Sequence, residues 1–125
     1  MPKNSFPFNL HNKQFRSSSN TANGEVTAAT RFHYRQRDQI VWATYEGGQI
    51  LFGTLSGFMN EKGELNFHYQ HQNLSGEFMT GKCLSIPEIG EGQPLRFKEY
   101  WQWTTGDQSK GESLIEEIGV MKNEE

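Results

Sequence analysis

The sequence predicts an all-β fold, a single antiparallel up-and-down barrel of about eight strands. Nine Phe, four Tyr and three Trp supply side chains that strands favour, and thirteen Gly suit tight turns. Apolar and polar residues alternate along most of the chain, which is the period of a half-buried strand. No segment of a dozen residues has helical periodicity, so no helix would cover a sheet edge. Closure into a barrel is then the most economical arrangement, with a two-sheet sandwich as the alternative.

The alternation divides the chain into short runs. In residues 25–36 one parity is mainly apolar or neutral, with Val26, Ala28, Thr30, Phe32, Tyr34 and Gln36, so we expect a strand there. Further strands are expected at 39–46, 49–58, 64–72, 77–86 and 95–104, with shorter candidates at 13–19 and 112–118. Turn signals such as NG at 23–24, GG at 47–48 and EKG at 61–63 separate these runs, as in a meander of hairpins.

The length of 125 residues fits one domain. We expect an irregular N-terminal arm at 1–12, the barrel domain at 13–118 and a charged tail at 119–125. The net charge of −3 comes from interspersed acids and bases, which gives no basic patch for nucleic acid. No apolar run is long enough for a signal peptide or a membrane span, so a cytoplasmic protein without nucleic-acid or membrane partners is expected.

Two similar runs, FHYRQ at 32–36 and FHYQH at 67–71, raise the question of a two-histidine site. Alternation places the Phe and Tyr of each run inside, so His33 and His68 would lie on the outer face. Residues three apart on a strand point to opposite faces, so the HYQH spacing does not form a local metal site. We therefore expect no metal.

The stretch GEFMTGKC at 76–83 resembles a phosphate-binding loop, but Cys83 replaces the hydroxyl residue and no helix follows. No cofactor is therefore expected. Cys83 is the single cysteine, which excludes an internal disulfide and a cysteine-based zinc cluster. No sequence motif places a histidine beside it, so a small buried apolar group is the simpler interpretation.

The segment RFKEYWQW at 96–103 carries the most informative candidate. Alternation places Phe97, Glu99, Trp101 and Trp103 on one face. A carboxylate on an apolar face is costly to bury without a partner, and desolvation would raise its pKa. The polar groups that could share its cavity are Tyr34, Gln36, Tyr45 and Tyr69. The alternatives are a Glu99 held in a structural hydrogen-bond network, or one that points outward.

The strings GEVTAATRFHYRQ, YEGGQILFGTLSG, TGKCLSIPE and KEYWQWTTGDQSKGESLIEEI resemble a family of small bacterial β-barrel proteins that often carry the label N-acetylglutamate synthase. The similarity runs from about Lys13 to Ile118. The resemblance implies a lipocalin-like or streptavidin-like (calycin) barrel. The label implies transfer of an acetyl group from acetyl-CoA to glutamate.

Three hypotheses for function follow. The first is a non-catalytic barrel that binds a small, partly polar molecule, with Tyr34, Tyr45, Tyr69, Glu99, Trp101 and Trp103 as the ligand-binding residues. The second is an enzyme, either the labelled acetyltransferase or one that uses Glu99 as general acid or base. The third is a structural module that self-associates, for example as a homodimer.

Overall fold

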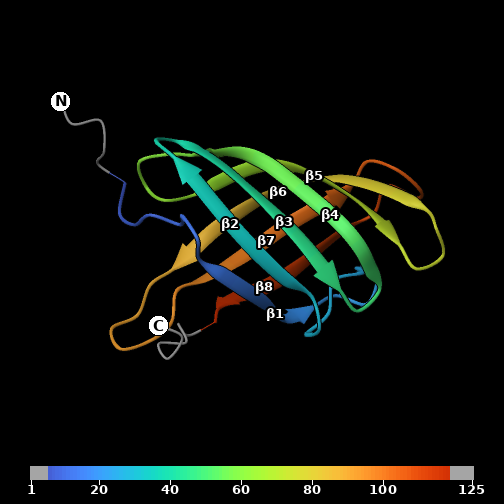
Figure 1. The fold of residues 1–125 in the computed structure, drawn as a ribbon, viewed down its shortest axis with the longest axis horizontal. Coiled ribbons are helices and arrows are strands. Elements are labelled where there is room, and N and C mark those ends of the chain that lie inside the picture. Colours follow the sequence, from blue (N-terminus) through green and yellow to red (C-terminus); the bar gives the residue numbers. More distant parts are fainter. Residues whose placement is uncertain (1–5, 119–125) are drawn as a thin grey trace.

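The computed structural model describes residues 6–118, which form a closed antiparallel barrel whose eight strands pair in sequence order (Figure 1). The strands are β1 (Gln14–Asn20), β2 (Arg31–Arg37), β3 (Ile40–Gly47), β4 (Ile50–Met59), β5 (Leu65–Asn73), β6 (Phe78–Glu88), β7 (Arg96–Trp103) and β8 (Lys110–Glu117). The predicted barrel is confirmed, and the sandwich alternative is wrong. The predicted arm at 1–12 and tail at 119–125 fall partly or wholly outside the described residues.

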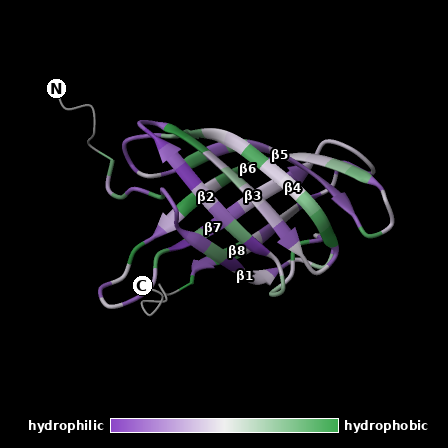
Figure 2. Cartoon of the chain, viewed as in Figure 1, coloured by the Kyte–Doolittle hydropathy of each residue, from purple (hydrophilic) through white to green (hydrophobic). Residues whose placement is uncertain are grey.

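Burial alternates along most of the strands and separates an inner from an outer face. Figure 2 shows hydrophilic and hydrophobic residues intermixed along the strands. Strand β7 buries Phe97, Glu99, Trp101 and Trp103, the parity expected from the sequence. The GG turn joins β3 to β4, where Gly47 and Gly48 have φ of 112° and 68°. Such angles favour glycine, so this turn signal has a direct conformational cause.

The expected strand at 25–36 is wrong in its first half, because β2 begins at Arg31. Residues 25–30 belong to the loop between β1 and β2. A turn forms there, in which the Thr30 amide donates to the Thr27 carbonyl (2.9 Å) and the Thr27 amide donates to Thr30 Oγ1 (3.1 Å). These local hydrogen bonds compete with a strand ladder.

Aromatic side chains and the end of the arm close the barrel opposite this loop. Phe15 packs against Tyr34 and Phe97, with ring centroids 5.3 and 5.8 Å apart. Phe8 from the arm meets Phe97 edge-on at 5.9 Å, and Leu10 is fully buried. The Leu10 amide donates to Gln36 Oε1 (2.9 Å), which fixes the arm to β2. This end of the barrel is therefore filled with side chains.

The seam where the barrel closes lies at β1, which pairs with both β2 and β8. Its register with β2 covers only Gln14 to Arg16, and its register with β8 shifts between Ser17 and Ser19. Beyond this point the chain leaves β2 and enters the loop at 21–30. Within residues 6–118 there is no helix long and apolar enough to cross a membrane.

Candidate functional site

An interior cavity of about 50 Å³ lies at the end of the barrel that the loop at 21–30 covers. Every strand contributes at least one lining residue. The lining consists of Asn20, Gly24, Glu25, Val26, Phe32, Tyr45, Leu55, Phe67, Tyr69, His71, Cys83, Glu99, Trp101, Trp103 and Ser113. Partly exposed residues among these, such as Glu25 and Val26 of the loop, mark the mouth. The wall is mainly aromatic, and the polar atoms are few and localised, as in small-ligand sites.

Glycines on neighbouring strands make room for the aromatic wall. Tyr45 pairs with Gly53, Tyr69 with Gly81, and Trp101 with Gly111. In each pair a Cβ added to the glycine would collide with the aromatic ring, so the ring lies across the glycine backbone. The rings therefore lie flat along the wall, and the space in the middle of the barrel stays open.

Glu99 lies at the bottom of the cavity and is buried, with 7% of its surface exposed. Its two oxygens accept hydrogen bonds from Ser85 Oγ (2.8 Å) and Ser113 Oγ (3.0 Å), on the two strands that flank β7. Burial raises the pKa of Glu99 to about 7, although the two serine hydroxyls oppose this rise. This carboxyl group therefore gains or loses its proton close to neutral pH.

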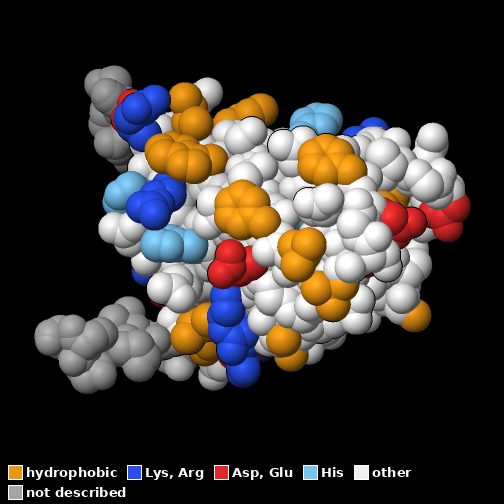
Figure 3. Space-filling view, turned by 45° about the vertical axis from the view of Figure 1, so that its right-hand side comes forward, with side chains coloured by type: hydrophobic (Ala, Val, Ile, Leu, Met, Phe, Trp, Pro, Cys, Tyr) orange, Lys and Arg blue, Asp and Glu red, His pale blue; other side chains and the backbone are white. Residues whose placement is uncertain are grey.

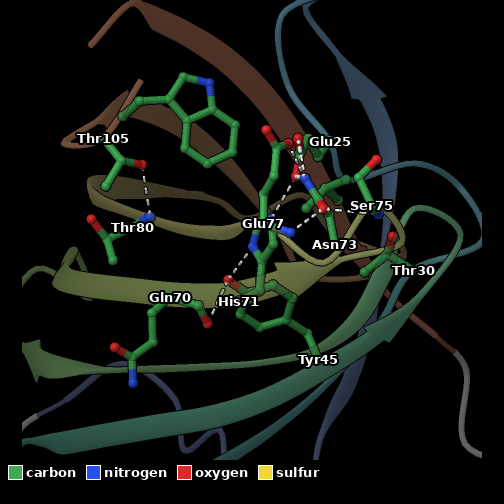
Figure 4. Close-up of polar contacts among 12 residues, drawn as sticks. Glu25, Thr30, Tyr45, Gln70, His71, Asn73, Ser75, Glu77, Thr80 and Thr105 are labelled. Atoms are coloured by element: carbon green, nitrogen blue, oxygen red, sulfur yellow. Dashed lines mark hydrogen bonds and ion pairs between the residues drawn. The ribbon is translucent and has the colours of Figure 1, made fainter. Parts of the chain in front are cut away.

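A second polar group lies at the mouth and joins the loop to the barrel (Figure 4). Tyr45 Oη lies 2.9 Å from His71 Nδ1, and His71 Nε2 lies 2.8 Å from Glu25 Oε1. With the imidazole proton on Nε2, the phenol donates to Nδ1 and the imidazole donates to the carboxylate. Asn73 Nδ2 also donates to Glu25, at 3.1 Å from Oε2. The loop is thereby attached to β5.

The two indoles make further attachments, one to the end of β1 and one to the loop that follows it. Trp101 Nε1 donates to Asn20 Oδ1 (3.2 Å), and Trp103 Nε1 donates to the Asn23 carbonyl (3.1 Å). Asn20 Nδ2 donates to the Val26 carbonyl (3.0 Å). Both tryptophan rings are held in place before any ligand arrives, which lowers the entropy cost of binding.

Burial keeps three tyrosines and the cysteine of the interior in their neutral forms at pH 7. Burial is the main cause that raises the pKa of Tyr45, of Tyr69 and of the Cys83 thiol. Burial and then the Glu99 charge raise the pKa of Tyr34, whose hydroxyl is buried without a hydrogen-bond partner among the described residues. Within residues 6–118, no cluster of three or more His, Cys, Asp or Glu could hold a metal ion.

The structure brings together five of the six residues predicted as ligand-binding. Tyr45, Tyr69, Glu99, Trp101 and Trp103 all line the cavity. The sixth residue, Tyr34, is buried but does not line the cavity, because it packs against Phe15 towards the closed end. Gln36, considered as a neighbour of Glu99, lies further along β2 and bonds to the arm instead.

Glu99 points inward, so the outward alternative is wrong. His68 is exposed and His33 lies half-buried on the outer parity, as expected. Sequence reasoning missed His71 and Glu25. His71 has the inward parity of β5, and this signal could have identified it. Glu25 carried no signal of its own, because its place depends on how the loop folds over the mouth.

The comparisons with known proteins agree with this geometry. The profile of the family described as "Avidin-like protein" matches residues 8–118. The chain belongs to the avidin-like family. No curated protein and no solved structure matches it. In this avidin-like barrel the matched region spans all eight strands and therefore every residue that lines the cavity. Eight-stranded barrels of this kind have interiors wide enough for side chains or one small ligand.

Proposed function

We propose that this avidin-like barrel binds a small molecule in the cavity above Glu99. The observation that carries the proposal is a buried carboxyl group inside a pre-positioned aromatic wall. Apolar walls with one or two placed polar groups are the usual composition of small-ligand sites. The five lining residues predicted from the sequence are the proposed contacts, and Tyr34 would support them from below.

Native mass spectrometry of the protein purified from the cells that produce it tests this proposal. We expect an adduct of constant mass that disappears on denaturation. Trp101→Ala should lose the adduct, whereas Trp42→Ala, on the outer side of β3, should keep it. If the Trp101→Ala variant and the Glu99→Gln variant both kept the adduct, the assignment of the site would be contradicted.

Catalysis is a second candidate function, and the pKa of Glu99 favours it. A carboxyl group with a pKa of about 7 is suited to act as general acid or base. In an enzyme, wild-type protein and Glu99→Gln should carry different molecules, because only the wild type converts substrate to product. A binding protein should carry the same molecule in both forms.

The N-acetylglutamate synthase activity implied by the resemblance has less support from the cavity. Acetyl-CoA and glutamate are anions, whereas two carboxyl groups and no Lys or Arg line the cavity among the described residues. The cavity volume of about 50 Å³ is also far below the roughly 300–1,000 Å³ of common ligand pockets. Incubation with acetyl-CoA and glutamate, followed by assay of released thiol, tests the activity directly. Thiol release that depends on Glu99 would favour it.

Self-association into a homodimer is proposed from a row of exposed apolar side chains. Ile40 pairs with Phe58, and Leu84 pairs with Tyr100, all on the outer face along one line across β3 to β7. Asn66 joins the two pairs. On the face shown in Figure 3, hydrophobic side chains are widely spread. Sedimentation should show a mass that increases with protein concentration. The double variant Phe58→Ser/Tyr100→Ser should lose this increase, whereas the control Leu51→Ser, at an exposed position elsewhere, should keep it.

The cytoplasm remains the proposed location. The buried free thiol of Cys83 is compatible with a reducing compartment, where thiols stay unpaired. Cell fractionation with an antibody against the protein tests this, and recovery in an extracellular or membrane fraction would contradict it.

A further inference from the structure

Two carboxyl groups give the cavity an acidic lining. Among the described residues, the hydrogen-bond partners of the Glu99 side chain are two serine hydroxyls, which are neutral. Glu25 is a second carboxylate, and its partners His71 and Asn73 lie at the mouth. Among the described residues, no Lys or Arg lines the cavity. A buried carboxylate without a cation is costly, so a ligand that brings positive charge would relieve this cost.

The aromatic wall is also suited to a cation. Trp101 and Trp103 are inclined at 62° to each other, and Tyr69 and Trp103 at 65°, so these rings form adjacent sides of the cavity. The faces of Trp and Tyr rings carry negative potential and attract ammonium groups, more strongly where water is excluded. The same rings also offer apolar surface to a short hydrocarbon chain.

The size of the cavity limits the ligand further. A volume of about 50 Å³ corresponds to roughly three to five water molecules, at about 10–15 Å³ each. A molecule of only a few heavy atoms enters without movement of the wall. Nucleotides and sugars are too large for this space.

We propose that the cavity takes a small organic monocation, a primary ammonium group on a short alkyl chain. The N–H groups donate to the Glu99 carboxylate and to Ser113 Oγ, whose lone pairs remain available. The alkyl chain lies among Trp101, Trp103 and Tyr69. This inference rests on the proposed function, since it names the class of ligand that the same site would bind.

Binding of such a cation is linked to the proton on Glu99. Above neutral pH, Glu99 is ionised and can pair with the ammonium group directly. Below neutral pH, Glu99 carries a proton, which must be released to solvent before the ammonium group binds. The other titratable groups that face the cavity are Glu25 from the loop, Tyr45 on β3, Tyr69 and His71 on β5, and Cys83 on β6, with Tyr34 below it. With a pKa of about 7 for Glu99, affinity should rise about tenfold from pH 6 to pH 8.

Tryptophan fluorescence offers a direct test. The chain has three Trp, so Trp42→Phe leaves only the two indoles of the cavity as reporters. This background is titrated at pH 8 with ethylammonium chloride, ethanol and sodium acetate, with NaCl used to hold the ionic strength constant. We expect saturation with ethylammonium at a concentration at least tenfold below that of ethanol, and no saturation with acetate.

Two further substitutions and one control test whether the charge of Glu99 determines ethylammonium binding. Glu99→Gln keeps the size and both serine partners, and it should weaken ethylammonium binding at least tenfold and remove its dependence on pH. Ser113→Ala keeps the Glu99 charge and should weaken binding less. Glu91→Gln, in the exposed turn between β6 and β7, is the carboxylate control and should change affinity by less than about threefold.

Ethanol or acetate binding as tightly as ethylammonium, an unchanged affinity in Glu99→Gln, or no response to ethylammonium would each overturn this proposal. The failures are distinguishable from failure of the proposed function. A neutral or anionic molecule that co-purifies and is lost in Trp101→Ala leaves small-molecule binding intact and removes only the cation.

Discussion

The phenol ring of Tyr69 lies across the backbone of Gly81, its antiparallel partner on β6. Tyr45 on Gly53 and Trp101 on Gly111 repeat the relationship on other strand pairs. The glycines therefore set the inner width of the cavity as directly as the aromatic residues do. A side chain in place of any of these glycines would push a ring inward.

Gly81→Ala should destabilise the barrel by about 1–3 kcal/mol, because the new methyl group overpacks against the Tyr69 ring. Urea denaturation followed by circular dichroism measures the free energy of unfolding. Gly90→Ala is the matched control, since Gly90 is exposed and its nearest neighbour is the flexible Gln93 side chain. Equal stability of the two variants would show that Tyr69 does not depend on Gly81.

The free energy of unfolding should fall as pH rises from about 4.5 to about 7. In this window the unfolded chain releases the Glu99 proton while the folded barrel, with its raised pKa, still holds it. A rise of about 2.5 pKa units corresponds to a loss of about 3 kcal/mol, which is complete above pH 7. Glu99→Gln should remove this loss and be more stable than wild type at pH 8. The exposed control Glu91→Gln should keep the wild-type profile.

Removal of the buried hydroxyl group should have opposite effects on stability at Tyr34 and at Tyr45. Tyr34 Oη has no partner among the described residues, so Tyr34→Phe should be neutral or stabilising by up to about 1 kcal/mol. Tyr45 Oη bonds to His71, so Tyr45→Phe should cost about 1–2 kcal/mol. Thermal unfolding of both variants measures the difference. Strong destabilisation by Tyr34→Phe would reveal a water or ligand bonded to that hydroxyl.

Leu10→Ala should destabilise the fold by about 2–5 kcal/mol, because it empties a fully buried position in the arm. The control Leu74→Ala removes an exposed side chain in the turn between β5 and β6 and should change stability by less than about 0.5 kcal/mol. Chemical denaturation of both variants compares them. Similar values would mean that the arm contributes little to closure of the barrel.

The direction in which side chains point could be predicted from the sequence, and their height along the barrel could not. Alternation placed Glu99 and its two tryptophans inside, since a period of two decides only which face a residue occupies. Tyr34 has the same inward parity as Phe32, yet only Phe32 reaches the cavity. Height depends on strand tilt and register, which need the closed barrel.

The loop at 21–30 was the other part beyond the reach of the sequence pattern. Residues 25–30 alternate like a strand, but their hydrogen bonds are satisfied by a local turn. The contact of Glu25 with His71, 46 positions apart, exists only because this loop crosses the mouth. No local periodicity encodes such a contact.

The short seam at β1 has a consequence for the order of folding. All other strand pairs are hairpin neighbours of low contact order, whereas β1 and β8 join Phe15 to Glu117 across nearly the whole chain. The seven strands β2 to β8 pair as hairpins at small loop-closure cost, so β1 is expected to dock last. Asn20 and the covering loop arrive with it. A ligand bound in the cavity would therefore lower the rate at which β1 separates from its neighbouring strands.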